Sequence, residues 1–158
     1  EIIMQLSKNF YLSEFITSQT AERLGIDNTP SDIIIANLTS LAKTVLQPLR
    51  DHYGCPVVIS SGYRCPKLNK AIGGAVSSQH MKGEAVDIKV PGVSNYDLAN
   101  YIKDNLNYDQ VILEFYTLSK PDSGLVHVSY SRTNQNKKSV PTAVLKDKMN
   151  VYLQGLVV

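Results

Sequence analysis

One segment near the middle of the chain constrains the fold more than any other. It places His80 and Asp87 seven residues apart, with Gly83 between them, and runs directly into an apolar stretch that ends at residue 90. We expect His80 in a loop and Asp87 inside a strand over residues 85–90, where a carboxylate has no packing reason to be. Imidazole nitrogens and carboxylate oxygens are both common zinc ligands. The segment therefore predicts two ligands of a metal site, to which the rest of the chain must bring the remaining groups.

Two further predicted strands each carry one polar group among apolar residues. The alternation over residues 125–130 places His127 on one face, and residues 110–116 contain Glu114 as a single carboxylate. Each has an ordinary explanation when taken singly: a strand histidine is usually a core or surface side chain, a glutamate on an edge strand faces solvent, and Asp87 would pair with a nearby lysine. Their coincidence predicts a hydrolytic zinc site of two histidines and one carboxylate with an open fourth position, and Glu114 as its general base.

A third position, Arg64, follows a predicted strand over residues 57–61 at the start of a loop. The ordinary interpretation is a surface arginine. The functional interpretation is a guanidinium that binds a substrate carboxylate or carbonyl oxygen through two parallel hydrogen bonds.

The remaining patterns predict an α+β fold: a single domain with a central, mainly antiparallel sheet and helices packed on it. Ser31 is the expected N-cap of a helix that runs to about residue 52, with Pro48 kinking or ending it. Its apolar stripe consists of Ile34, Leu38, Leu41, Val45 and Leu49. Ser94 is expected to cap a second helix, and the strands over residues 110–116 and 125–130 are expected to pair as a hairpin.

Other segments give weaker signals. We expect Ser13 to cap a short helix after residue 10, and residues 18–30 and 62–69 to be irregular. Residues 144–156 are ambiguous between helix and strand.

Length and charge restrict the class of protein. The chain has 158 residues, which suits one domain, and its net charge of +2 comes without a Lys/Arg-rich block, so we expect no nucleic-acid partner. No apolar run approaches the roughly 18–20 residues that span a bilayer, so we expect no membrane partner, and we expect a monomer. Cys55 and Cys65 are too few for a disulfide framework; we expect two reduced or buried thiols, with a single bridge as the alternative. Because the first residues lack a basic n-region and a long apolar region, we expect either a removed secretory signal or synthesis in the cytoplasm.

Taken together, these motifs resemble the zinc D-Ala-D-Ala carboxypeptidase family, murein peptidases that also resemble the hedgehog signalling domain. The resemblance rests on Ser61-Gly62-Tyr63-Arg64, Leu68-Asn69, Gly73-Gly74, Ser78-x-His80-x-x-Gly83-x-Ala85-x-Asp87 and Val126-His127-Val128-Ser129. It covers about residues 8–132 of a single zinc peptidase domain over residues 1–158, and leaves residues 133–158 as a C-terminal extension. The segments Asn9-Phe10, Ser13-Glu14-Phe15 and Asn28-x-Pro30 are similar to those of small phage- and prophage-type members.

The resemblance implies both a reaction and a set of roles. The implied reaction is zinc-dependent hydrolysis of bacterial cell-wall stem peptides, as in a D-Ala-D-Ala-type carboxypeptidase or an endolysin-like endopeptidase of peptidoglycan. The implied metal ligands are His80, Asp87 and His127; the implied catalytic residues are Glu114 and Arg64; the implied substrate-binding residues are Arg64, Ser78 and Gln79.

The chain departs from the family near the last histidine. Many relatives carry an acidic residue or a histidine a few positions before it, often beside a tryptophan, whereas this chain has no tryptophan. Asp122 is the acidic residue nearest to that place and is the second candidate for the base, after Glu114. The missing tryptophan leaves one wall of the substrate site undefined. A different class of function also fits: a zinc-bearing but non-catalytic peptidoglycan-binding or virion structural module.

Overall fold

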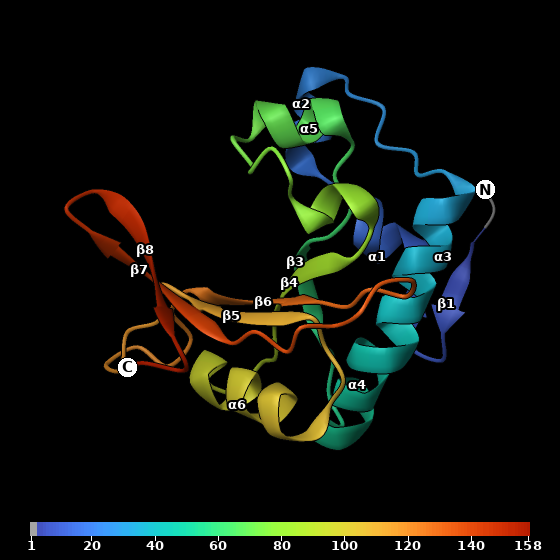
Figure 1. Cartoon of the computed structure of the whole chain (residues 1–158). Helices are drawn as coiled ribbons and strands as arrows, with labels where there is room; N and C mark the ends of the chain where they lie inside the picture. The colour runs from blue at the N-terminus through green and yellow to red at the C-terminus, as the bar shows by residue number, and fades with distance from the viewer. Residues whose placement is uncertain (1–2) are drawn as a thin grey trace.

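The computed structural model describes residues 3–158. A six-stranded sheet runs through the centre of the protein (Figure 1). Its strands lie in the order β3–β4–β6–β5–β7–β8. Their bounds are Val58–Ser61 (β3), Ala85–Lys89 (β4), Gln110–Glu114 (β5), Leu125–Ser129 (β6), Pro141–Lys146 (β7) and Met149–Gln154 (β8). Neighbouring strands are antiparallel except β5 and β7, which are parallel. The predicted α+β fold with a mainly antiparallel sheet, and the predicted β5–β6 hairpin, are therefore confirmed.

Helices cover one face of this sheet. The long helical segment consists of α3 (Asp32–Leu41), a π-helical turn η1 (Ala42–Leu46) and α4 (Gln47–Tyr53), and α6 spans Asn95–Asn105. In the predicted stripe of the long segment, Ile34 is partly buried and the residues from Leu38 to Leu49 are fully buried. The stripe packs in one core with α6 and with alternate residues of the strands, among them Val86, Ile88 and Val128. Because side chains alternate along a strand, the residues between these core positions point to the opposite face. That opposite face is where the polar strand residues lie.

The caps of the long helices follow the sequence, but Pro48 does not end its helix. The Oγ of Ser31 accepts a hydrogen bond from the Ile34 N–H, and the Oγ of Ser94 accepts one from the Asp97 N–H, as predicted for N-caps. Pro48 lies in the first turn of α4, directly after the π-helical turn η1. Proline has no N–H to donate to the preceding turn, and a wider π-helical turn accommodates it without ending the helix.

Three segments near the N-terminal half differ from the sequence prediction. Residues 18–30 are not irregular, because α2 (Gln19–Leu24) begins at the cap Ser18 and ends at Gly25. Residues 62–69 contain α5 (Pro66–Ala71), which starts with a proline in its first turn. His80 lies in a 3-10 turn, η2 (Gln79–Lys82), and not in an open loop. These helices have four to six residues, too few for a hydrophobic period to be recognised.

The N-terminal entry also differs in its cap. Strands β1 (Gln5–Ser7) and β2 (Phe10–Tyr11) form a small second sheet, and α1 (Leu12–Ile16) follows at once. Tyr11, and not Ser13, is the N-cap, because the Glu14 carboxylate accepts a hydrogen bond from the Tyr11 N–H.

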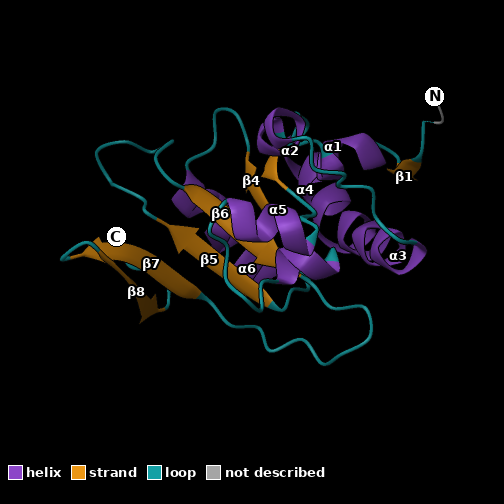
Figure 2. Cartoon of the chain, turned by 90° about the horizontal axis from the view of Figure 1, so that it is seen from above, coloured by secondary structure: helices purple, strands orange, loops and turns teal. Residues whose placement is uncertain are grey.

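The ambiguous C-terminal segment is a β-hairpin. β7 and β8 pair along their whole length, and β7 adds to the edge of β5. Figures 1 and 2 show the hairpin at the end of the sheet remote from α3. The last residues thus extend the central sheet instead of forming a separate unit.

Cys55 and Cys65 are both free thiols. Among the helices of residues 3–158, none has the length and apolar character required to cross a membrane.

Candidate metal centre and active site

The register of the sheet gathers the polar strand residues on the face opposite α3, α4 and α6. Asp87 on β4 is paired with His127 on β6, and His127 is paired in turn with Ile112 on β5. Side chains at paired positions share a face, so Asp87 and His127 are direct neighbours. Glu114 is two residues beyond Ile112 on the same strand and therefore on the same face. The three strands that each carried one polar residue are thus adjacent in space.

His80 reaches the same place from the turn η2. The Ser78 Oγ accepts a hydrogen bond from the His80 N–H at 3.2 Å and so caps this turn. Gly83 ends it with a φ of +70°, and a side chain there would come within 2.9 Å of the Ile34 side chain on α3. His80 is 3% exposed, and its Nδ1 lies 2.8 Å from the Gly62 carbonyl oxygen. Because a carbonyl only accepts, Nδ1 carries the proton and Nε2 is directed at the strands.

The three residues His80, Asp87 and His127 form a group that can hold a metal ion, since their ligand atoms all lie within 4.8 Å of one another. Asp87 Oδ1 is 3.4 Å from His80 Nε2 and 3.1 Å from His127 Nδ1. Tetrahedral zinc with bonds of about 2.0–2.1 Å keeps its ligand atoms about 3.3 Å apart, close to these separations. A neutral His80 would direct a lone pair at the carboxylate, which is repulsive unless a cation lies between them. The chemistry and spacing of this donor set therefore fit zinc.

The Asp87 carboxylate is held in its charged form although it is only 7% exposed. Burial by itself would raise its pKa, but the hydrogen bonds and positive charge of His127 and His80 outweigh burial and hold the pKa well below its usual range. The site is thus arranged for a carboxylate that faces cationic partners.

Glu114 lies in the same pocket under the opposite influence. Burial raises the pKa of its carboxyl, and the nearby charge of Asp87 raises it further, while His127 and Arg64 lower it in part. A carboxyl whose pKa is moved up toward neutrality accepts protons more readily, which is the property that a general base requires.

Arg64 is held in place by three side chains. Its Nε donates to the Ser61 Oγ at 3.1 Å and its Nη1 to the Asn69 Oδ1 at 3.2 Å, while Nη2 lies 3.6 Å from Asp87 Oδ2. Its backbone N–H donates to the His80 carbonyl. The guanidinium is largely buried beside the metal-binding group, so it differs from a solvent-exposed surface arginine.

The candidate site is a pocket of about 310 Å³. Its lining includes the expected metal ligands, the preferred base and the expected substrate-binding residues: Arg64, Ser78, Gln79, His80, Asp87, Glu114 and His127. Gln79 donates from Nε2 to the Asp109 carboxylate at 3.1 Å, which ties η2 to the start of β5. The pocket also contains Tyr152 from β8, which the sequence did not indicate.

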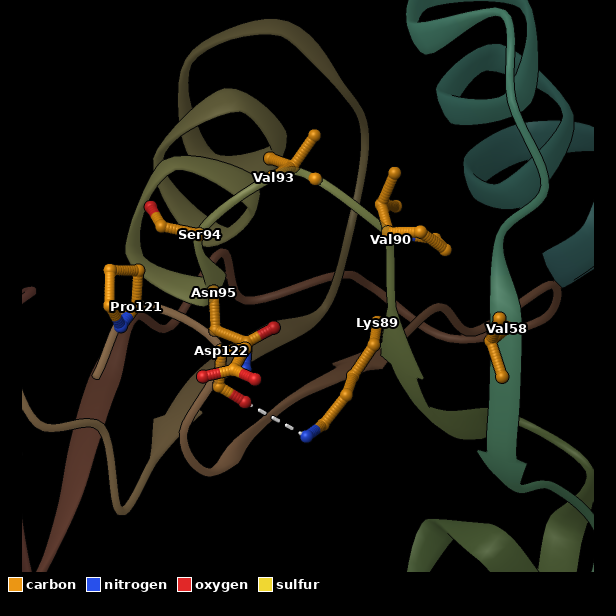
Figure 3. A pocket seen from close by; sticks show the side chains of 10 residues that line it. Val58, Lys89, Val90, Val93, Ser94, Asn95, Pro121 and Asp122 are labelled. Atoms are coloured by element: carbon orange, nitrogen blue, oxygen red, sulfur yellow. Dashed lines mark hydrogen bonds between the residues drawn. The ribbon is translucent and has the colours of Figure 1, made fainter.

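Asp122, the second candidate base, lies elsewhere. It lines a separate and more apolar pocket of about 530 Å³ beside the start of α6 (Figure 3). Its backbone carbonyl accepts a hydrogen bond from the Lys89 Nζ at 3.0 Å. Of the two acidic candidates, Glu114 is the one that shares a pocket with the metal-binding group.

Sequence reasoning missed the groups that support the site. The Gly62 carbonyl orients His80, and Asn69 holds both Arg64 and the Ala75 carbonyl. A backbone carbonyl leaves no signal of its own in a sequence. Asn69, by contrast, belongs to the Leu68-Asn69 pair that resembles the family, and this pair could have indicated that Asn69 supports the site.

Comparison with known proteins agrees with this geometry. Residues 8–121 match the model of the family described as peptidase M15. No curated protein matches the chain. The family match covers most of the chain, so the protein belongs to the peptidase M15 family, the zinc D-Ala-D-Ala carboxypeptidase family. Peptidases of this family depend on zinc, and the His80–Asp87–His127 group supplies donors of the kind that zinc requires.

Proposed function

We propose that this M15 peptidase hydrolyses bacterial cell-wall stem peptides at a D-amino-acid bond, as a D-Ala-D-Ala-type carboxypeptidase or an endolysin-like endopeptidase. The observation that carries the proposal is one pocket that contains the His80–Asp87–His127 group, an acidic residue outside that group, Glu114, and the cation of Arg64. These are the parts that metal-assisted hydrolysis of an amide needs.

The proposed roles follow from the position of each group. His80, Asp87 and His127 would hold zinc, which when bound supplies Lewis acidity and a nucleophile available near neutral pH. Glu114 accepts a proton on its carboxylate from the water that attacks the peptide carbonyl, and later delivers this proton to the leaving amine. Arg64 lines the pocket beside Asp87 and stabilises negative charge on the oxygen of the scissile carbonyl or on a substrate carboxylate.

Two features support catalysis over a purely binding role. Burial in an apolar strand disfavours the charged form of the Glu114 carboxyl and raises its pKa. Placing this residue there therefore costs folding free energy. Arg64 is fixed by Ser61 and Asn69 in a direction that leaves it beside the metal-binding group. A module that only bound peptidoglycan would have no use for a general base beside a metal-binding group.

The experiment is digestion of purified peptidoglycan with mass analysis of the products, with and without a chelator. We expect release of peptide fragments or of terminal D-alanine, loss of both with chelator, and recovery when zinc is restored. The masses identify the bond. A Glu114→Gln variant that retains zinc but releases nothing supports the assigned base. Wild-type protein that contains zinc, binds peptidoglycan and cleaves nothing would contradict the proposal and favour the non-catalytic module.

A further inference from the structure

We propose that the C-terminal hairpin β7–β8 forms one wall of the substrate site, and that Tyr152 contacts stem peptides several residues away from the scissile bond. This inference rests on the proposed function for the identity of the ligand. The hairpin would make hydrolysis depend on the length of the substrate, and Tyr152 would be the residue responsible. Both lie outside residues 8–121, the part of the chain that matches the family model.

The pairing of the strands connects Tyr152 to Glu114. Glu114 on β5 is in register with Ala143 on β7, and Ala143 is paired with Tyr152 on β8. The Phe115 N–H, next in the chain to Glu114, donates to the Ala143 carbonyl at 2.9 Å. The proposed base and the aromatic ring thus lie in one cross-strand row, with only the short side chain of Ala143 between them.

Tyr152 is exposed on the pocket side of this row. The residue lines the same pocket as the metal-binding group and Glu114, yet 58% of its surface is open to solvent. Figure 1 shows the hairpin rising from the sheet on the side where α5 lies, away from α6. An aromatic side chain that lines a polar pocket and remains largely uncovered has surface free to pack on a ligand.

The base of the hairpin is held by specific hydrogen bonds, which fixes where the ring lies. Thr142 Oγ1 donates to the Gly155 carbonyl at 2.6 Å and accepts from the Val157 N–H at 2.9 Å. The Gly155 N–H donates to the Val140 carbonyl at 2.7 Å. The Ser139 N–H donates to the Asp109 carbonyl. The wall is therefore tied to the start of β5 as well as to its end.

The distance across the sheet predicts how long a substrate must be. His127 lies on β6, and β8 is three strands away in the order β6–β5–β7–β8. At about 4.8 Å per strand this is about 14 Å, which an extended peptide of about four residues spans. This is the separation of the strand backbones, so a stem peptide of four or five residues covers the whole width to β8, whereas a dipeptide bound at the metal-binding group covers less of it.

The test compares short and long substrates in matched variants. We expect Tyr152→Ala to lower kcat/KM on a stem pentapeptide about 10-fold through a higher KM, a larger loss than on D-Ala-D-Ala dipeptide, and to leave the zinc content unchanged. Tyr152→Phe separates packing by the ring from hydrogen bonding by the hydroxyl. Leu153→Ala is the control, because Leu153 is the next residue of β8, points to the opposite face and is also partly exposed.

A binding measurement separates this inference from the proposed function. Zinc-loaded Glu114→Gln protein is titrated with the stem pentapeptide, with and without Tyr152→Ala, and the dissociation constants are compared. A roughly 10-fold weaker Kd supports the hairpin contact even if no bond is cleaved. Equal Kd values, or an equal loss of activity on dipeptide and pentapeptide, would overturn the inference, whereas a wild-type protein that cleaves no stem peptide refutes only the proposed function.

Discussion

Replacing Gly62 by alanine should weaken zinc binding although the residue touches no metal. Gly62 makes two close contacts that the methyl group of an alanine would disturb. Its carbonyl accepts the hydrogen bond from His80 Nδ1, and its Cα faces the backbone of Phe15 at the end of α1. The neighbouring Tyr63 N–H donates to the Phe15 carbonyl at 2.6 Å, which holds the two segments together.

The size of the effect follows from this close approach. A Cβ at Gly62 would overlap the Phe15 carbonyl oxygen and lie 2.8 Å from its Cα and 2.9 Å from its carbonyl carbon, whereas ordinary contacts begin at 3.4 Å. Backbone atoms cannot rotate away, so the segments must separate by at least about 0.6 Å, and such overpacking costs about 1–3 kcal/mol. The same shift disturbs the hydrogen bond that orients His80. Loss of such an outer-shell partner lowers metal affinity about 10–100-fold, equivalent to about 1.4–2.8 kcal/mol.

Two measurements separate these effects. Urea unfolding in the presence of a chelator gives the cost to the fold, and competition with a fluorescent zinc chelator gives the affinity. Gly54→Ala is the control: Gly54 ends α4 at a φ of +64° and a Cβ there meets nothing within 4 Å. It should lose about 1 kcal/mol of stability from backbone strain and keep its zinc affinity. Folded Gly62→Ala protein with wild-type zinc affinity would refute the role given to the Gly62 carbonyl.

Further predictions concern the metal and the two carboxylates. Chelation should lower the unfolding temperature, and zinc at 1,000 times its Kd should restore about 4 kcal/mol, measured by thermal unfolding. Glu114→Gln should keep about one zinc and lose about 10²–10⁴-fold in kcat on stem peptide. The pKa of Glu114 is raised in the folded state, so metal-free Glu114→Gln protein should be more stable than wild type at pH 7. The difference in free energy of unfolding should vanish below pH 4.5, the ordinary pKa of glutamate. A difference that stays constant from pH 7 to below pH 4.5 in urea unfolding would contradict the assignment. The pKa of Asp87 is lowered in the folded state, so its carboxylate should contribute fully to the stability of the metal-free protein at pH values above 3.8, the ordinary pKa of aspartate. This contribution should be lost as the pH falls below 3.8, and Asp87→Asn should lack this part of the acid transition in urea unfolding.

The sequence allowed the sheet and the gathering of polar residues to be predicted because period-2 alternation makes a single polar residue in an apolar strand conspicuous. Asp87, Glu114 and His127 were each identified in this way, and the register places them side by side. The short helices α2 and α5 were missed, since six residues give less than two turns of periodicity, although their caps Ser18 and Cys65 were present.

Contacts between distant segments could not be predicted. The Gly62–His80 hydrogen bond joins residues 18 apart through a backbone carbonyl, which every residue possesses. Tyr152 is one of nine tyrosines and lies in a segment whose pattern fitted helix as well as strand. Its position depends on β7 joining β5 in parallel, a pairing decided by the whole sheet.

The alternation of β4 makes the metal group and the core depend on the same register. Val86 and Ile88 are fully buried against the helices, while Asp87 between them points into the pocket. A shift of one residue would send the carboxylate into the core and both apolar side chains into the site, so the core enforces the position of the candidate ligand. In return, the buried Asp87 carboxylate opposes folding unless cations face it. The hydrogen bond with His127 meets that need in part, and a bound zinc ion would add full positive charge beside the carboxylate, so metal binding and the stability of the central sheet are expected to be coupled.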